Sequence, residues 1–71
     1  MRLHYYPETD SLYIELTNRP GAESSVIAEG VFVDFDAQGS IVGIDIDRAT
    51  EKLDLSTLET VELPVKRIKS A

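Results

Sequence analysis

The sequence predicts a mainly β fold: an antiparallel meander sheet of about five strands, followed by short helical turns and an extended arm, with an α+β fold as the alternative. Three observations support this. Apolar and polar residues alternate with a period of two over several short segments. Turn-forming Pro, Gly and Asp residues separate those segments. At 71 residues, the chain has room for one small domain only.

The first two strands are expected at residues 3–6 and 12–16, separated by a turn that contains Pro7 and Asp10. The apolar pattern favours the register in which Tyr6 lies opposite Ser11, because a shift of one residue would mix apolar and polar side chains on each face. On this register one face of the hairpin carries Leu3, Tyr5, Leu12 and Ile14.

A loop with Pro20-Gly21 leads to a second hairpin, residues 23–28 and 31–35. Its two-residue turn is Glu29-Gly30, in which glycine can take the positive φ that a tight hairpin requires. The expected pairs are Val26 with Val33 and Ala28 with Val31.

Residues 37–40 form the third turn and lead to a fifth strand over residues 41–46. With Asp36 opposite Ile41, apolar side chains meet on one face, as in a sheet that is wetted on one side only. The expected pairs are Phe35 with Val42, Val33 with Ile44 and Val31 with Ile46. The opposite, outer face then carries Asp34, Asp36 and Asp45.

The pattern changes after Asp47, which is suited to cap a short helix over residues 48–53. Asp54 or Ser56 is placed to cap another turn near Leu58.

Residues 61–65 alternate like a strand, but Pro64 restricts them to a sheet edge or an extended arm. We therefore expect a single domain over residues 1–71, with the meander at 2–47, helical turns and an arm at 48–66, and a frayed tail at 67–71.

The composition limits the classes of protein to which this chain can belong. Thirteen acidic and seven basic residues give a net charge of −6, which disfavours direct nucleic-acid binding and is compatible with a basic protein partner or with simple solubility. The absence of cysteine excludes disulfides. Neither a signal peptide nor a membrane-spanning apolar run is evident, so we expect a cytoplasmic protein without a membrane partner.

Three segments resemble domain-of-unknown-function family 2283, a family of small bacterial proteins: residues 6–14, residues 29–36 and residues 39–46. They occur in the expected order and spacing. The resemblance implies a compact, mainly β fold and no established activity, and some members look like partners encoded beside toxin-like proteins. It supplies no catalytic residues to carry over.

Two candidate sites for chemistry are weak. Residues 34–45 fit part of a twelve-residue calcium loop, but Gln38 and the shorter Asp45 occupy ligand positions and β-strands replace the flanking helices. His4 is the only histidine and is expected beside Tyr13 on the outer face, where an ordinary exposed histidine is the commoner situation. We therefore expect no catalytic residue, no metal and no cofactor.

The function favoured by these observations is a non-enzymatic protein-interaction module, in one form an antitoxin-like neutralising partner of a basic protein. The alternative is a small metal-dependent or hydrolytic enzyme that uses the outer-face carboxylates with His4. A solvated sheet face without a role also remains open. The residues expected to form the interaction surface are Phe32, Asp34, Asp36 and Asp45.

A homodimer is also expected, because the predicted apolar face of the sheet exceeds what the chain itself can cover. Twelve apolar or aromatic side chains are expected to point inward: Leu3, Tyr5, Leu12, Ile14, Leu16, Val26, Val31, Val33, Phe35, Val42, Ile44 and Ile46. The segment after Asp47 offers six as cover: Leu53, Leu55, Leu58, Val61, Leu63 and Val65. A second copy would bury the remainder.

Overall fold

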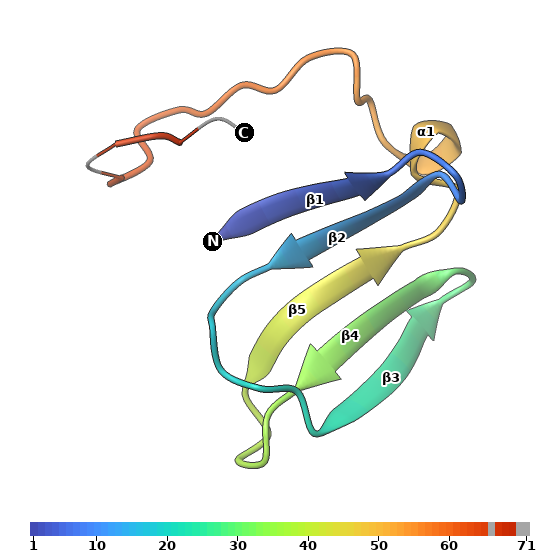
Figure 1. Cartoon of the computed structure of the whole chain (residues 1–71), viewed down its shortest axis with the longest axis vertical. Coiled ribbons are helices and arrows are strands. Elements are labelled where there is room, and N and C mark those ends of the chain that lie inside the picture. Colours follow the sequence, from blue (N-terminus) through green and yellow to red (C-terminus); the bar gives the residue numbers. More distant parts are fainter. Residues whose placement is uncertain (66, 70–71) are drawn as a thin grey trace.

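The computed structural model describes residues 1–65 and 67–69. Five strands form one open antiparallel sheet in the order β1-β2-β5-β4-β3, and one short helix follows the last strand (Figure 1). The elements are β1 Arg2–Tyr6, β2 Ser11–Glu15, β3 Glu23–Ala28, β4 Val31–Phe35, β5 Ile41–Ile46 and α1 Ala49–Lys52.

The mainly β class with five antiparallel strands is confirmed, but the strand order differs from a simple meander. β5 lies between β2 and β4, so that the chain crosses from β2 to the far edge of the sheet before it forms β3. The pairing of β2 with β5 joins Leu12 to Ile46 and Ile14 to Ile44. Such apolar cross-strand pairs stabilise a sheet, and three of the six residues of β3 are polar.

The β1–β2 hairpin has the register that the apolar pattern predicts. Tyr6 lies opposite Ser11, and Arg2 lies opposite Glu15 at the other end of the hairpin. The Arg2 guanidinium donates from Nε to Glu15 at 3.1 Å. Period-two alternation was sufficient here because every residue of both strands pairs without interruption.

A β-bulge changes the register of the β3–β4 hairpin. Gly30 has a φ of 70° in the tight turn, and Ala28 pairs with Val31 as expected. The register then shifts between Val26 and Ala28, so that Val26 lies opposite Phe32 and not opposite Val33. The expectation that Val26 points inward was wrong, because a bulge inserts one unpaired residue and reverses the faces beyond it. Val26 is 65% exposed.

The β4–β5 register agrees with the expectation at one end and departs from it at the other. Val31 pairs with Ile46 and Val33 pairs with Ile44. A second irregularity follows Asp34, so that Phe35 pairs with Ile41 and not with Val42. Val42 is buried in the chain, where one of its methyl groups lies close to the loop glycine Gly21.

The core is small and lies on one face of the sheet, which we call the inner face. Leu12, Ile46 and Ala49 are its buried members, and Ala49 brings α1 against the end of β2 and β5. Partly buried apolar side chains pack around them: Ile14, Val31 and Ile44.

Helix α1 is capped from a distant turn and not by Asp47, as the sequence had suggested. Arg48 precedes the helix in the left-handed region, with a φ of 50°, and makes no side-chain cap. The Asp10 carboxylate instead accepts hydrogen bonds from the Thr50 backbone N–H at 3.2 Å and the Thr50 hydroxyl at 2.6 Å. These contacts tie the β1–β2 turn to the helix N-terminus.

Residues 53–65 form an extended arm after α1. The second helical turn expected near Leu58 is absent from the described chain, although Asp54 does accept a hydrogen bond from the Ser56 N–H at 3.0 Å. Residues 61–65 have bent and irregular backbone without strand pairing, and Glu62 has a φ of 54°. In the predicted 67–71 tail, residues 70 and 71 lie outside the described residues, as does residue 66.

Within the described part of the chain, no helix has the length and apolar character needed to cross a membrane.

Candidate functional site

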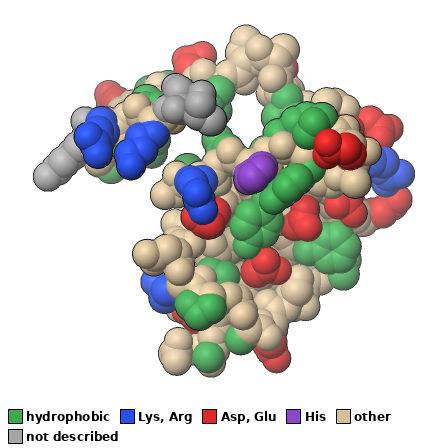
Figure 2. Space-filling model, viewed as in Figure 1, with side chains coloured by type: hydrophobic (Ala, Val, Ile, Leu, Met, Phe, Trp, Pro, Cys, Tyr) green, Lys and Arg blue, Asp and Glu red, His purple; other side chains and the backbone are tan. Residues whose placement is uncertain are grey.

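Side chains from three neighbouring strands meet in one row on the outer face of the sheet. Tyr13 of β2 lies opposite Asp45 of β5, and Asp45 lies opposite Phe32 of β4. Asp34 follows two residues after Phe32 and therefore shares its face. Figure 2 shows this side of the molecule, with acidic side chains lying among hydrophobic ones beside the single histidine.

Tyr13 reaches across β5 because residue 43 has no side chain. A Cβ atom on Gly43 would lie 2.0 Å from the Tyr13 hydroxyl oxygen and 2.5 Å from its ring carbon Cζ. The ring thus occupies the space above Gly43, and its hydroxyl donates to Asp34 Oδ2 at 3.0 Å. Burial and the nearby Asp34 carboxylate raise the pKa of Tyr13, so this hydroxyl keeps its proton near neutral pH.

Asp45 is the half-buried carboxylate at the centre of this group. Its pKa is raised, first by burial and then by repulsion from Asp47 and Asp34. Asp34 and Asp47 therefore lie close enough to disfavour the charge on Asp45. None of the ion pairs among the described residues includes Asp34, Asp45 or Asp47.

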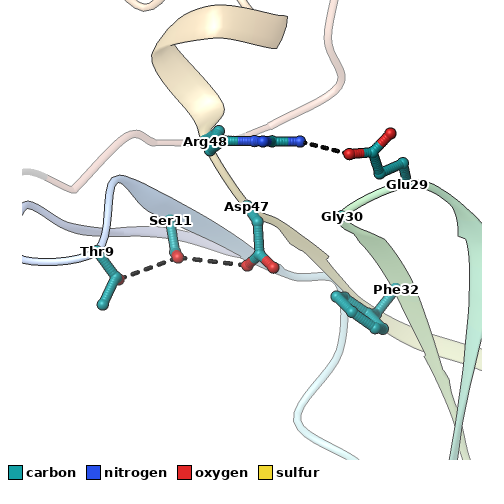
Figure 3. Close-up of a pocket in the computed structure, with 7 residues that line it drawn as sticks. All are labelled: Thr9, Ser11, Glu29, Gly30, Phe32, Asp47 and Arg48. Carbon is teal, nitrogen blue, oxygen red and sulfur yellow. Dashed lines mark hydrogen bonds and ion pairs between the residues drawn. The ribbon is translucent and has the colours of Figure 1, made fainter.

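Asp47 connects this row to an open hollow of about 640 Å³ at the end of the sheet. Ser11 donates from Oγ to Asp47 Oδ1 at 3.4 Å, and Phe32 forms a wall beside Asp47 (Figure 3). Above them, Arg48 donates from Nη2 to Glu29 Oε1 at 2.9 Å. Arg48 is thus bound to Glu29 and does not neutralise Asp47 through an ion pair.

We call Tyr13, Phe32, Asp34, Asp45 and Asp47 the outer patch. The sequence predicted Phe32, Asp34 and Asp45 as surface residues on one face, and the structure brings these three together. The sequence analysis did not assign Tyr13 or Asp47 to this surface. Asp47 could have been found because it lies two residues after Asp45 and so faces the same side of the strand. Tyr13 could have been found because Gly43 leaves room for a large neighbour.

Asp36 lies outside the outer patch, contrary to the predicted register. Its carboxylate is buried in the turn after β4 and accepts hydrogen bonds from the backbone N–H groups of Gln38 at 3.0 Å and Ser40 at 2.9 Å. Arg19 of the β2–β3 loop donates to it at 2.9 Å. The Ser40 and Gln38 N–H groups and then Arg19 lower the pKa of Asp36. Asp36 therefore closes a turn and anchors a loop, since all its partners are within the chain.

His4 lies on the outer face opposite Tyr13, as expected, and stacks on Tyr6 with ring centroids 4.4 Å apart. Among the hydrogen bonds of the described residues, none joins His4 to a carboxylate. The arrangement is an aromatic stack on the edge strand β1, at one end of the row that contains Asp45.

The predicted calcium-like segment does not fold into a cage. Asp36 is engaged by Arg19, and Asp34 by Tyr13. Throughout residues 1–65 and 67–69, no group of three or more histidine, aspartate or glutamate side chains is arranged to hold a metal ion.

Residues 2–49 match the family described as Protein of unknown function (DUF2283). This segment includes all five strands and the outer patch, and it ends at the first residue of α1. The chain belongs to this family. The search of curated proteins found no match, and neither did the search of solved structures.

Proposed function

We propose that this chain is a non-enzymatic protein-interaction module whose outer patch binds basic side chains of a partner protein. The observation that supports this most strongly is the state of Asp45. It is half-buried, it is repelled by two neighbouring carboxylates, and it takes part in none of the ion pairs of the described residues. A lysine or arginine from a partner would relieve both the repulsion and the cost of burial.

The aromatic members of the outer patch favour the same kind of ligand. Tyr13 and Phe32 flank Asp45 on the two neighbouring strands. A guanidinium or ammonium group held by the carboxylate would lie against these rings, and cation–π contact adds about 0.5–1 kcal/mol at exposed sites. The hydroxyl of Tyr13 is already directed at Asp34, which fixes the ring in place.

The charge of the whole chain acts in the same direction. A net charge of −6 gives a long-range attraction for basic proteins, and it slows the approach of acidic ones. A specific form of the proposal is that the chain neutralises a basic toxin-like protein encoded next to it. Co-expression with such a neighbour is expected to restore growth and yield a co-purifying complex, whereas neither result would occur if this form were wrong.

The general form is tested with a fluorescent oligolysine peptide, titrated against the full chain at low and at physiological salt. Asp45→Asn is expected to weaken binding about fivefold, equivalent to ~1 kcal/mol. Glu59→Gln is the matched control, because it removes the same charge from the segment after α1, which runs past β1 outside the outline of the strands (Figure 1).

Equal losses of affinity in the two variants would mean that the peptide senses net charge only, and the outer patch would not be the binding site. An oligoglutamate peptide should not bind at either salt concentration.

A further inference from the structure

Two sets of apolar side chains remain uncovered in the single chain besides Val26 and Ile27 of β3, Tyr6 and Ile41. One lies on the inner face at β1, where Leu3 is 46% and Tyr5 is 40% exposed. The other is the arm, residues 53–65, where Leu58 is 78% and Val61 is 76% exposed. None of the large side chains in the described chain is fully buried. The sheet therefore has a core on one side that is only partly closed.

The accessible surface measures how much is left uncovered. The chain exposes 5878 Å², whereas a folded monomer of 7.9 kDa exposes about 4,400 Å². The excess is about 1,500 Å². The radius of gyration, 13.1 Å, likewise exceeds the ~11 Å expected for a compact domain of this length.

The arm accounts for part of this excess. Figure 1 looks onto the face of the sheet, and the arm leaves α1 and runs past β1, outside the outline of the strands. In this position it covers neither face of its own sheet. Fully extended, these thirteen residues would span up to ~43 Å, more than the 31 Å that the longest dimension of the chain measures. The arm is long enough to reach across a second molecule.

The distribution of charge decides which faces two copies can bring together. The outer face carries the carboxylates of the outer patch, so two copies of net charge −6 would repel each other there. The inner face of the four strands β1, β2, β4 and β5 is apolar. The chain itself buries Leu12, Val33 and Ile46, it covers Ile14, Val31 and Ile44 in part, and it leaves Leu3 and Tyr5 exposed.

We propose that two copies of this chain pack through their inner faces, and that the arm of each copy lies against the other. Burying the excess surface of both copies would remove about 3,000 Å², which is within the range of obligate homodimers. The outer patch of each copy stays exposed in this arrangement. The inference is therefore independent of the function proposed above.

The first test is the mass of the full chain in solution by light scattering at micromolar concentration. A dimer of about 16 kDa is expected, twice the 7.9 kDa of one chain. A mass of 7.9 kDa across the concentration range would overturn the proposal.

A pair of matched variants then locates the interface. Val61→Glu places a charge on the arm, and Val26→Glu places the same charge on the outer face, where Val26 is 65% exposed. Because the arm forms no strand or helix, Val61→Glu should leave the circular dichroism of the sheet unchanged. We expect Val61→Glu to shift the mass to that of a monomer and Val26→Glu to retain the dimer. The reverse pattern would place the interface on the outer face.

The exchange of arms has its own test, which the absence of native cysteine makes simple. A spin label on Leu63→Cys in one chain is mixed with an isotope-labelled chain that carries no spin label. The methyl groups of Leu3 and Ile44 are expected to broaden, while those of Val26 stay sharp. If none of these methyl groups broadens, the arm does not lie on the other copy.

Discussion

The close approach of Tyr13 to Gly43 predicts an unusually strong response to the smallest possible side chain. In Gly43→Ala the new methyl carbon would lie 2.0 Å from the Tyr13 hydroxyl oxygen, 2.5 Å from Cζ and 3.2 Å from Cε1. A rigid ring cannot avoid three such contacts by a small adjustment, so it must rotate away. It then loses the hydrogen bond to Asp34.

The expected cost combines two contributions. Overpacking a well-fitted contact costs about 1–3 kcal/mol, and a hydrogen bond to a charged group contributes about 1.5–3 kcal/mol, with less at a part-buried site. Alanine also reduces the conformational freedom of the unfolded chain, which stabilises the folded state by about 0.4–1 kcal/mol. We expect Gly43→Ala to lower the free energy of unfolding by about 2 kcal/mol.

The assay is urea unfolding at fixed protein concentration, carried out as a double-mutant cycle with Tyr13→Ala. All three of the nearest contacts to the new methyl group come from Tyr13. In the Tyr13→Ala background, Gly43→Ala should therefore cost about 0 kcal/mol or become slightly stabilising. An equal cost in both backgrounds would refute the steric explanation and would point to the backbone of residue 43 instead.

Three further predictions concern single carboxylates. The raised pKa of Asp45 means that the folded chain binds a proton at this carboxyl more readily than the unfolded chain does. Asp45→Asn should therefore raise the urea midpoint at pH 7, and this gain in stability should shrink as the pH falls through the raised pKa. An unchanged midpoint at pH 7 would contradict this. The pKa of Asp36 is lowered, so its charged form stabilises the fold. Asp36→Asn should lower the melting temperature at neutral pH, and the difference from the unmodified chain should vanish as the pH falls through the lowered pKa. A difference that is independent of pH would exclude a role for the charge. Asp10→Ala removes the cap of α1. Hydrogen exchange should therefore accelerate at the Thr50 and Leu53 amides and stay slow in β5. Uniform acceleration would instead indicate loss of the whole fold.

Local sequence signals located all three hairpins but gave the full register of the first one only. The register of the first hairpin was predicted correctly because alternation and a short turn specify one register, although each strand begins one residue earlier than expected. The pairing of β2 with β5 was not predicted, because strands that are far apart in sequence are joined by tertiary packing, which leaves no local signal. The bulge at Ile27 was equally invisible in the sequence, since every residue of β3 is exposed and burial therefore does not select its register.

The candidate site was predicted in part for the same reason. Asp34, Asp45 and Phe32 follow from alternation within regular strands. Asp36 was misplaced because it lies in the turn just after β4, where alternation ends and a short acidic side chain folds back on nearby N–H groups. The cap of α1 was assigned to Asp47 on sequence proximity, whereas Asp10 is forty residues from the Thr50 it holds.

The most direct test of the outer patch as a binding surface is the pKa of Asp45, followed by carbon NMR of its side-chain carboxyl in the full chain. Asp54 serves as an internal reference, because hydrogen bonds from Ser56 lower its pKa. A basic ligand held at the outer patch stabilises the charged form of Asp45. Adding oligolysine is therefore expected to lower the raised pKa of Asp45 and to leave that of Asp54 unchanged. If the pKa of Asp45 is the same with and without the peptide, or if both carboxyl groups shift equally, the outer patch does not bind basic side chains.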